Sequence, residues 1–393
     1  MTSDRIFGTP PLEQTDLDVI ADVHAMRASL ADVLRVPRRW TGGLRRTTQA
    51  RALKGSNSIE GYVVTAQDAL AAVDQEAPLD ADRRTWAEIM GYRRMMTYVL
   101  TAGARADGRV SADLLRVLHY MLLEHDLEKS PGGFRAGPIY IRESTTGKTV
   151  YEAPDAEMVP QLIDSLVASI EHDRAHRRPK GNDPMVRAAM AHLNLVMIHP
   201  YRDGNGRMSR ALQTLVLAQG NVLEPTFCSI EEWLGDNTDD YYRVLAATGR
   251  GSWHPENNAT LWLRFNLRAH HLQAQMLQRR FREADETWVR LDDLVRQHGL
   301  PDRTADALFE ATLGNRVTRP GYMRRTTMEE RTATRDLVRL AELGLLRPFG
   351  KARGRYYVAG TGLDALQSSV LVDRRPLDDP YPWLAGELRR LAP

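Results

Sequence analysis

The sequence His199-Pro-Tyr-Arg-Asp-Gly-Asn-Gly-Arg-Met-Ser-Arg210 lies between two runs of apolar residues with helical spacing. We expect the first helix to end at His199, because proline disfavours helical dihedral angles at the residue before it. The central Asp-Gly-Asn-Gly predicts a tight turn, since glycine and asparagine adopt positive φ at little cost. A second helix is expected to begin around Arg207. The stretch therefore predicts two helices joined by a glycine-rich turn.

The residues of this turn are of the types that bind phosphate. Free backbone N–H groups of Gly204–Gly206, at a helix N-terminus, favour an anion. Arg207 and Arg210 are three residues apart, so they share a helix face and can both donate to phosphate oxygens. Asp203 offers a carboxylate for Mg²⁺, and His199 can act as a base near neutral pH. Together they predict a phosphoryl- or nucleotidyl-transfer site rather than a plain turn between helices.

The composition of the chain is that of a globular protein. Of its 393 residues, 42% are hydrophobic and 26% are charged, which disfavours a disordered protein. No apolar run approaches the roughly 18 residues of a membrane helix, and the N-terminus lacks the pattern of a secretory signal. The single cysteine, Cys228, excludes an intramolecular disulfide. We therefore expect a cytoplasmic protein without a membrane partner.

The spacing of apolar residues predicts a mainly α fold. Such residues recur every three or four positions almost throughout, which is typical of amphipathic helices. Strand-like alternation is confined to Pro138–Tyr151 and Leu346–Val358, and we expect a β-hairpin at each. A long helix is predicted from about Ala259 to Glu286, with a domain boundary near its end. The tail from Asp373 is rich in Pro, Asp and Arg and is expected to pack loosely.

The turn resembles the signature of the Fic family, His-x-Phe-x-[Asp/Glu]-Gly-Asn-Gly-Arg-x-x-Arg. Every position matches except the aromatic one, where Tyr201 replaces phenylalanine. Gly133–Arg135, followed by the hairpin over 138–151, is similar to the flap region of that family. The resemblance spans about Ala31 to Ala274 and implies a helical core whose flap overlies the active site. The flap would hold an extended segment of the target protein by strand pairing, whereas a simple surface hairpin is the alternative.

The resemblance also implies an activity, the transfer of AMP from ATP to a Ser, Thr or Tyr hydroxyl of a target protein. His199 would deprotonate that hydroxyl, and Asp203 would hold Mg²⁺. The residues that would bind the phosphates are Gly204, Asn205, Gly206, Arg207 and Arg210. The Doc-like branch of the family phosphorylates instead and has lysine at the position of Gly204. The glycine of this chain therefore favours AMP transfer.

Two neighbouring tyrosines, Tyr241 and Tyr242, match a pair that lines the adenine pocket in relatives. The resemblance therefore implies that both belong to the ATP-binding residues. Consecutive residues of a helix cannot share one face, however. The alternative is that one tyrosine belongs to the core and the other to the pocket.

A second motif, Ser56-Asn-Ser-Ile-Glu60-Gly61, fits the pattern [Ser/Thr]-x-x-x-Glu-[Gly/Asn]. In the Fic family this pattern marks an autoinhibitory helix, here at about residues 48–61. Ser56 and Glu60 would share a helix face, and Gly61 suits the end of a helix. The resemblance implies that Glu60 pairs with Arg210 and displaces the γ-phosphate of ATP. In some relatives the same glutamate serves the removal of AMP, and a solvated glutamate at a helix end is the alternative.

The C-terminal part is basic. Between Ala311 and Val358 the chain has eleven basic and four acidic residues. A helix is predicted from about residue 332 to 344, before the second hairpin, and helices around Leu291–Gln297 and Ala305–Thr312 precede it. This order resembles a winged helix. One basic helix edge would consist of Arg331, Arg335 and Arg339. DNA binding and docking to a protein are both open for this module.

The sequence predicts a chain of four regions with an enzymatic activity. The regions are an N-terminal helical region with the inhibitory helix (1–110), a Fic core (111–284), a winged-helix-like domain (285–360) and a tail (361–393). The expected activity is that of an autoinhibited protein adenylyltransferase that uses ATP and Mg²⁺ and modifies a protein substrate or itself. The alternative is a DNA-binding regulator whose Fic core acts as a nucleotide sensor. The intact His199 and Asp203 favour the enzyme, and homo-oligomerisation is left open.

Overall fold

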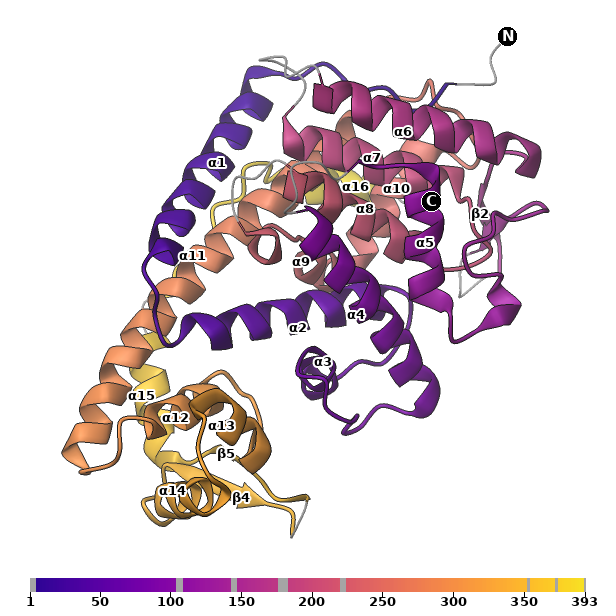
Figure 1. The fold of residues 1–393 in the computed structure, drawn as a ribbon. Coiled ribbons are helices and arrows are strands. Elements are labelled where there is room, and N and C mark those ends of the chain that lie inside the picture. Colours follow the sequence, from indigo (N-terminus) through magenta and orange to yellow (C-terminus); the bar gives the residue numbers. More distant parts are fainter. Residues whose placement is uncertain are drawn as a thin grey trace. The chain divides into compact units, whose positions relative to one another are not determined.

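The computed structural model describes residues 5–103, 109–142, 147–175, 183–219, 224–351, 354–371 and 374–391 (Figure 1). It divides into two compact units. Unit 1 comprises Met1–Ala31, Gln49–Ala274 and Asp378–Pro393, and unit 2 comprises Asp32–Thr48 and Gln275–Leu377. Each unit combines segments that are distant in sequence, whereas the four regions predicted above are consecutive stretches of the chain. Those regions stay a prediction.

Helices dominate the described residues, so the mainly α fold is confirmed. The elements that precede the flap are α1 (Gln14–Arg35), α2 (Thr41–Ile59), α3 (Ala66–Val73), α4 (Arg83–Gly103), α5 (Ala112–Leu123) and the short 3₁₀ helix η1 (Leu127–Lys129). After the flap come η2 (Ala156–Met158), α6 (Val159–Ala175), α7 (Pro184–Ile198), α8 (Asn205–Gln219), η3 (Pro225–Phe227), α9 (Glu231–Asp236), α10 (Thr238–Gly249) and α11 (Thr260–Gln297). No helix of the described residues is long and apolar enough to cross a bilayer.

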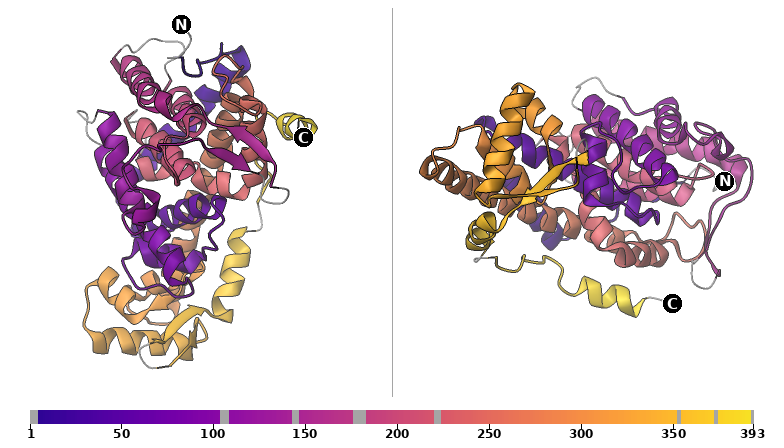
Figure 2. Two further views of the ribbon diagram at one scale, coloured as in Figure 1. Left: turned by 90° about the vertical axis from the view of Figure 1, so that its right-hand side faces the viewer. Right: turned by 90° about the horizontal axis from the view of Figure 1, so that it is seen from below.

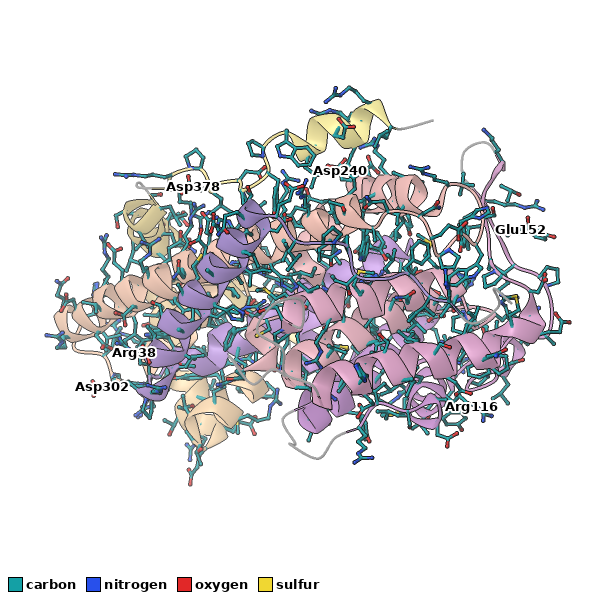
Figure 3. The ribbon with its side chains drawn as sticks, turned by 90° about the horizontal axis from the view of Figure 1, so that it is seen from above. Arg38, Arg116, Glu152, Asp240, Asp302 and Asp378 are labelled. Atoms are coloured by element: carbon teal, nitrogen blue, oxygen red, sulfur yellow. The ribbon has the colours of Figure 1, made fainter. Side chains whose placement is uncertain are left out.

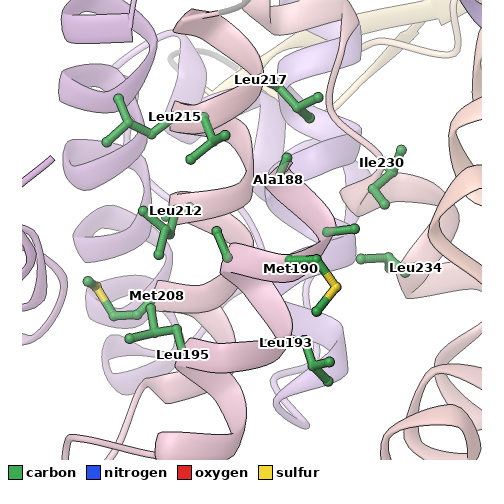
Figure 4. Packing of buried hydrophobic residues seen from close by; sticks show 14 of the residues in the cluster. Ala188, Met190, Leu193, Leu195, Met208, Leu212, Leu215, Leu217, Ile230 and Leu234 are labelled. Atoms are coloured by element: carbon green, nitrogen blue, oxygen red, sulfur yellow. The ribbon is translucent and has the colours of Figure 1, made fainter. Parts of the chain in front are cut away.

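Helices α7 and α8 form the centre of unit 1. Nearly every residue of both is buried, which explains why α7 is apolar on several faces rather than along one stripe. Helix α8 also buries polar side chains, among them Arg207, Arg210 and Gln213. Figure 4 shows their apolar side chains packed together, with Ile230 and Leu234 beside them. Helices α4 and α5 pack against α8, and α6 packs against α7. The predicted pair of helices around the glycine-rich turn is thus confirmed, and α8 begins at Asn205, two residues before the expected start.

The first predicted hairpin is confirmed as a hairpin, and we call it the flap after the family region that its sequence resembles. Strands β1 (Tyr140–Arg142) and β2 (Thr149–Glu152) pair antiparallel, with Tyr140 opposite Glu152. Glu152, at the end of β2, is labelled in Figure 3. The turn at 143–146 lies outside the described residues. Tyr151 is buried, and its hydroxyl donates to the carbonyl oxygen of Met197 at 3.0 Å. Strand β2 is therefore fixed to the last turn of α7, directly before the glycine-rich turn.

Unit 2 contains a small sheet with helices around it (Figures 1 and 2). Its elements are α12 (Thr304–Thr312), β3 (Val317–Thr318), α13 (Arg319–Thr326), α14 (Glu330–Glu342), β4 (Leu346–Phe349), β5 (Tyr356–Ala359) and α15 (Thr361–Leu371). The strand order is β3-β5-β4, and both pairs are antiparallel. Strands β4 and β5 confirm the second predicted hairpin, and α12, α14 and α15 contact the sheet.

Helix α11 is longer than predicted. It does not end near Glu286 but continues to Gln297, so the separate helix expected over Leu291–Gln297 is its last part. The reason is that the apolar face continues through buried Trp288, Leu291 and Val295, without a glycine or proline between them. The helix ends just before Gly299, whose φ of +61° suits a helix terminus.

The C-terminal tail does not pack loosely, contrary to expectation. Tyr381, Leu384 and Leu388 are buried in unit 1, and the last two belong to α16 (Leu384–Arg390). Helix α16 packs against α10, near Asp240 (Figure 3). The hydroxyl of Tyr381 donates to the buried carboxylate of Asp16 at 2.8 Å. The prediction was wrong because it rested on the many Pro, Asp and Arg residues and not on the few apolar residues with helical spacing.

Helix α2 lies against α9 where both helices carry glycine. A Cβ atom on Gly55 would lie 2.3 Å from the carbonyl oxygen of Glu231, and one on Gly235 would lie 2.5 Å from the Cα of Gly55. Replacing Gly55 with alanine should therefore force the helices apart and lower the free energy of unfolding by about 1–3 kcal/mol. Urea unfolding followed by circular dichroism measures this loss.

A matched control exists in the same helix. Gly42 is exposed, and a Cβ atom there would have no atom within 4 Å. Gly42→Ala should leave the free energy of unfolding unchanged or raise it by about 0.5–1 kcal/mol, because alanine favours helix. Equal effects of the two substitutions would contradict the close approach of α2 and α9.

Candidate active site

The turn between α7 and α8 is held by its own side chains. His199 ends α7 in the left-handed region, with φ 51° and ψ 58°, and its N–H donates to the carbonyl oxygen of Leu195 at 3.1 Å. The Asn205 side chain clamps the turn: its Oδ1 accepts from the N–H of Tyr201 at 2.9 Å, and its Nδ2 donates to the Tyr201 carbonyl at 2.8 Å. Gly204 has φ +77°, which favours glycine. The turn therefore has one defined shape.

The imidazole of His199 has the protonation state of a base. Its Nδ1 donates to the carbonyl oxygen of Val196 at 3.1 Å, which leaves Nε2 of the neutral ring as an acceptor. Burial, with a contribution from the charge of Arg135, lowers the pKa of His199 to about 4. The guanidinium of Arg135 donates to the His199 carbonyl at 2.8 Å, which ties the flap region to the turn. At pH 7 the ring is thus neutral and able to accept a proton.

Arg210 is fully buried and faces the end of helix α2. Its Nη2 donates to Oε1 of Glu60 at 2.6 Å and to the Ser56 carbonyl at 2.9 Å, and its Nε donates to Oγ of Ser56 at 2.7 Å. Its Nη1 has no hydrogen-bond partner in the described part of the chain. Glu60 and Gly61, whose φ is +84°, follow the last helical residue, Ile59. The structure thus brings the 56–61 motif onto the last arginine of the turn motif.

Glu60 also covers the first turn of α8. A Cβ atom on Gly206 would lie 2.3 Å from Oε1 of Glu60, so a larger residue there would require the carboxylate to shift. The N-terminus of a helix favours an anion, and in this structure the carboxylate of Glu60 lies there. The place predicted for the outer phosphates of a nucleotide is therefore taken by a side chain of the protein.

Arg207 points to a different helix from Arg210. It is buried, and its Nη1 contacts Oε2 of Glu88 on α4 at 2.5 Å, while its guanidinium lies over the ring of Tyr62 at 5.4 Å. Burial opposes ionisation of Glu88, but the charges of Arg207 and Lys129 lower its pKa to about 2. The two arginines predicted to bind together thus pair with separate carboxylates, Glu88 and Glu60.

Asp203 is paired with a lysine that the sequence analysis did not identify. Oδ2 of Asp203 lies 2.7 Å from Nζ of Lys129, and Nζ also donates to Oε1 of Glu88 at 2.9 Å. Burial opposes ionisation of Asp203, but Lys129 holds its pKa below the usual value. A chain of alternating charges therefore lies beside the turn, in the order Asp203, Lys129, Glu88 and Arg207.

Another residue missed from the sequence is His119 of α5. Its Nδ1 accepts from the N–H of Gly132 at 2.8 Å, so Nε2 carries the proton and donates to the Asp203 carbonyl at 3.0 Å. Its ring stacks on Tyr201 with 3.8 Å between centroids. The one signal in the sequence was a polar residue on the apolar face of a helix. His119 supports the turn from below.

The two tyrosines of α10 are separated by the structure. Tyr241 is buried, and its hydroxyl donates to Nε2 of His192 at 2.9 Å, because the Nδ1 proton of His192 is directed to Oε1 of Gln213 at 2.5 Å. Tyr242 is 47% exposed, and its hydroxyl donates to the carbonyl oxygen of Ile59 at 2.9 Å. Only Tyr242 is thus in a position to contact a ligand, and it also holds the last turn of α2.

A divalent cation would find one carboxylate at this turn. No group of three or more His, Cys, Asp or Glu side chains that could hold a metal occurs among the described residues. Magnesium bound to nucleotides commonly takes one or two carboxylates and completes its shell with phosphate oxygens and water. The oxygen of Asp203 that meets the ammonium of Lys129 is already in contact with a cation. Asp203 therefore fits magnesium that arrives with phosphates.

Comparison with known proteins agrees with this geometry. Residues 109–217 match the Fic/DOC family. Among curated relatives, the protein adenylyltransferase Fic of Nematostella vectensis is 23% identical over 201 residues, 51% of this chain and 43% of that protein. Protein adenylyltransferase fic-1 of Caenorhabditis elegans is 36% identical over 153 residues, 39% of this chain and 27% of that protein. The chain spans less than half of the length of these two relatives.

Solved structures show the same fold. A Fic family protein from Desulfovibrio desulfuricans superposes with a TM-score of 0.55 at 22% identity, over 90% of this chain and 98% of the other. Fic-1 from C. elegans superposes with a TM-score of 0.51 at 20% identity, over 66% and 71%. The matched residues 109–217 contain the flap and the whole turn motif, and the chain therefore carries a Fic domain of the Fic/DOC family.

Proposed function

We propose that this chain is a protein adenylyltransferase, which transfers AMP from ATP to a Ser, Thr or Tyr hydroxyl of a target protein or of itself. The observation that carries the proposal is the neutral imidazole of His199 directly before a turn that begins a buried helix, α8. A proton acceptor and an anion-binding helix N-terminus thus adjoin each other. The curated relatives, which are named protein adenylyltransferases, support the same activity.

His199 supplies the base of the proposed reaction. Its Nε2 accepts the proton of the target hydroxyl as that oxygen attacks the α-phosphorus of ATP. The bond between the α-phosphorus and the oxygen that bridges to the β-phosphate breaks, and pyrophosphate leaves. Because burial lowers the pKa of His199 to about 4, the ring needs no deprotonation before the reaction at neutral pH.

The turn and α8 position the triphosphate. The N–H groups at the start of α8 and the donors of Arg210 are proposed to hold phosphate oxygens, with Gly204 and Gly206 leaving room for their approach. Asp203 would hold magnesium, which when bound supplies positive charge to the phosphates. Tyr242 is the proposed contact of the adenine ring. Arg207 as an ATP ligand stays a prediction, since Glu88 already binds it.

Glu60 is proposed to inhibit this reaction. A phosphate oxygen and the Glu60 carboxylate cannot both occupy the Nη2 donor of Arg210, and their like charges repel. Productive seating of ATP therefore requires Glu60 to leave the first turn of α8. We further propose that the same carboxylate can accept a proton from water, the step needed for removal of AMP. Release of AMP from purified modified chain tests that second activity.

The position of the label in ATP tests the proposed function. The purified chain, with Glu60 replaced by glycine, is incubated with Mg²⁺ and ATP labelled on either the α- or the γ-phosphate. AMP transfer retains the α label on protein and releases the γ label with pyrophosphate. Retention of the γ label would instead indicate phosphorylation, and retention of neither would contradict the proposed enzyme.

A DNA-binding regulator is the second candidate, supported by the surface of α14. Arg331, Arg335 and Arg339 are exposed on one side of this helix, and the order of elements from α12 to β5 is that expected for a winged helix. Binding to duplex DNA should then weaken steeply as salt rises from 50 to 200 mM, by about a thousandfold for six phosphate contacts. Binding that is absent or insensitive to salt favours a docking role.

The cytoplasmic location and homo-oligomerisation stay predictions.

A further inference from the structure

Lys129 lies in a cage of carboxylates that no motif of the sequence indicates. Its Nζ is 2.7 Å from Oδ2 of Asp203, 2.9 Å from Oε1 of Glu88 and 3.7 Å from Oδ2 of Asp126. The three carboxylates come from the turn before α8, from α4 and from the residue that caps η1. The side chain of Lys129 is 16% exposed. An ammonium thus reaches the turn from the segment that leads into the flap.

The cage places a cation on the carboxylate that is proposed to hold magnesium. Asp203 cannot offer Oδ2 to a divalent ion while the ammonium remains at 2.7 Å, so Lys129 and the ion compete for it. Lysine suits such an exchange, because its compact charge lies at the end of a flexible stem. Arginine, with a rigid planar fork, would be harder to move aside.

The second contact of Lys129 keeps it near the turn after such an exchange. Glu88 accepts from Lys129 through Oε1 and meets Arg207 through Oε2, so the buried Arg207 fixes the carboxylate. Glu88 would thus retain the ammonium beside the turn when Asp203 turns to another cation. An ammonium that has lost the Asp203 carboxylate and lies beside a bound triphosphate can donate to the phosphate oxygens instead.

We propose, on the basis of the proposed function, that Lys129 has two alternating roles. Without nucleotide it is the internal counter-ion of Asp203. When ATP and magnesium bind, it leaves Asp203 and binds phosphate oxygens of ATP, which makes it a further substrate-binding residue. Glu88 and Arg207 act as positioning residues for Lys129. Lys129 thus has a negatively charged partner both without nucleotide, where it is Asp203, and with ATP bound, where it is a phosphate.

Two titrations of opposite sign test this proposal, both on the full chain with Glu60 replaced by glycine. Lys129→Met should tighten Mn²⁺ binding in the absence of nucleotide by about tenfold, since Asp203 loses its competitor, and electron paramagnetic resonance of free Mn²⁺ measures this. The same variant should weaken ATP binding in the presence of Mg²⁺ by about tenfold, the effect of one charge-assisted hydrogen bond. Isothermal titration calorimetry measures the second change.

Two further variants keep the test sharp. Lys129→Arg retains the charge but should leave Asp203 less readily, so it should recover only part of the ATP affinity. Lys351→Met, at an exposed lysine of unit 2, should change neither titration. If Lys129→Met weakened the binding of both Mn²⁺ and ATP, Lys129 would have a purely structural role and the proposal would be overturned. Unchanged binding of both would overturn it as well. If the parent protein takes up no ATP, the proposed function itself fails. If the parent protein binds ATP and Lys129→Met binds ATP and Mn²⁺ with the same affinities as the parent, only the proposed roles of Lys129 fail.

Discussion

Replacing His199 with alanine is expected to abolish transfer of the label of α-labelled ATP to protein while ATP binding persists. The imidazole is the proposed acceptor of the hydroxyl proton, and its Nδ1 donates to the Val196 carbonyl, which leaves Nε2 as the acceptor. General-base catalysis commonly contributes about 10²–10⁴-fold in rate. Autoradiography of the protein gives the rate, and calorimetry with ATP gives the affinity.

The outcome of this substitution separates a catalytic from a structural role. His199 adopts a left-handed conformation, so alanine at this position also adds backbone strain, and thermal unfolding should be recorded for the variant. His254→Ala, at an exposed histidine of the same unit, is the matched control and should leave transfer unchanged. Full transfer by a folded His199→Ala protein would exclude the proposed mechanism. Loss of both transfer and ATP binding would assign His199 to the shape of the turn.

Replacing Glu60 with glycine is expected to raise self-modification sharply, by about tenfold to a hundredfold. The substitution removes the carboxylate from Nη2 of Arg210 and from the first turn of α8, which are the proposed contacts of the outer phosphates. One charge-assisted hydrogen bond of about 1.5–3 kcal/mol corresponds to this range. Incorporation of α label into the chain over time measures the gain.

The same variant has a second, independent signature. Without Glu60 the fully buried Arg210 loses the carboxylate that contacts its Nη2 and keeps its hydrogen bonds to Ser56. A buried charge that loses its ion-pair partner destabilises the fold. The thermal midpoint should therefore fall in the absence of ATP and rise further on addition of ATP than in the unmodified chain. Glu256→Gly, at an exposed glutamate of the same unit, should show neither effect. Unchanged self-modification in Glu60→Gly would contradict inhibition at this position.

Local patterns were sufficient for the elements around the turn. Apolar spacing identified α7 and α8, His-Pro located the end of α7, and alternation identified both hairpins. The pairing of Glu60 with Arg210 followed from a family motif, and the structure brings these residues together although 150 positions separate them. Each of these inferences rests on a short, contiguous pattern that limits the structure of the chain.

Contacts between isolated residues could not be predicted in this way. Glu88 and Lys129 belong to no motif of the sequence, and a charged residue on a helix or loop looks like a solvated one. Their proximity to Arg207 and Asp203 arises only when α4 and η1 pack beside α8, a property of the whole unit. For the same reason the tail residues Tyr381–Leu388 were judged by their polar neighbours rather than by the core they enter.

The glycine contact between α2 and α9 determines how far Glu60 would have to move to end the proposed inhibition. Gly55 meets the backbone of α9, and Glu60 lies five positions further along, just past the last residue of α2. A helix pinned by its backbone so close to its end can open by unwinding a single terminal turn, while the rest of it stays in place. Few hydrogen bonds have to break, among them that of Tyr242 to Ile59. A small stimulus, rather than dissociation of a whole helix, is then enough to uncover the turn.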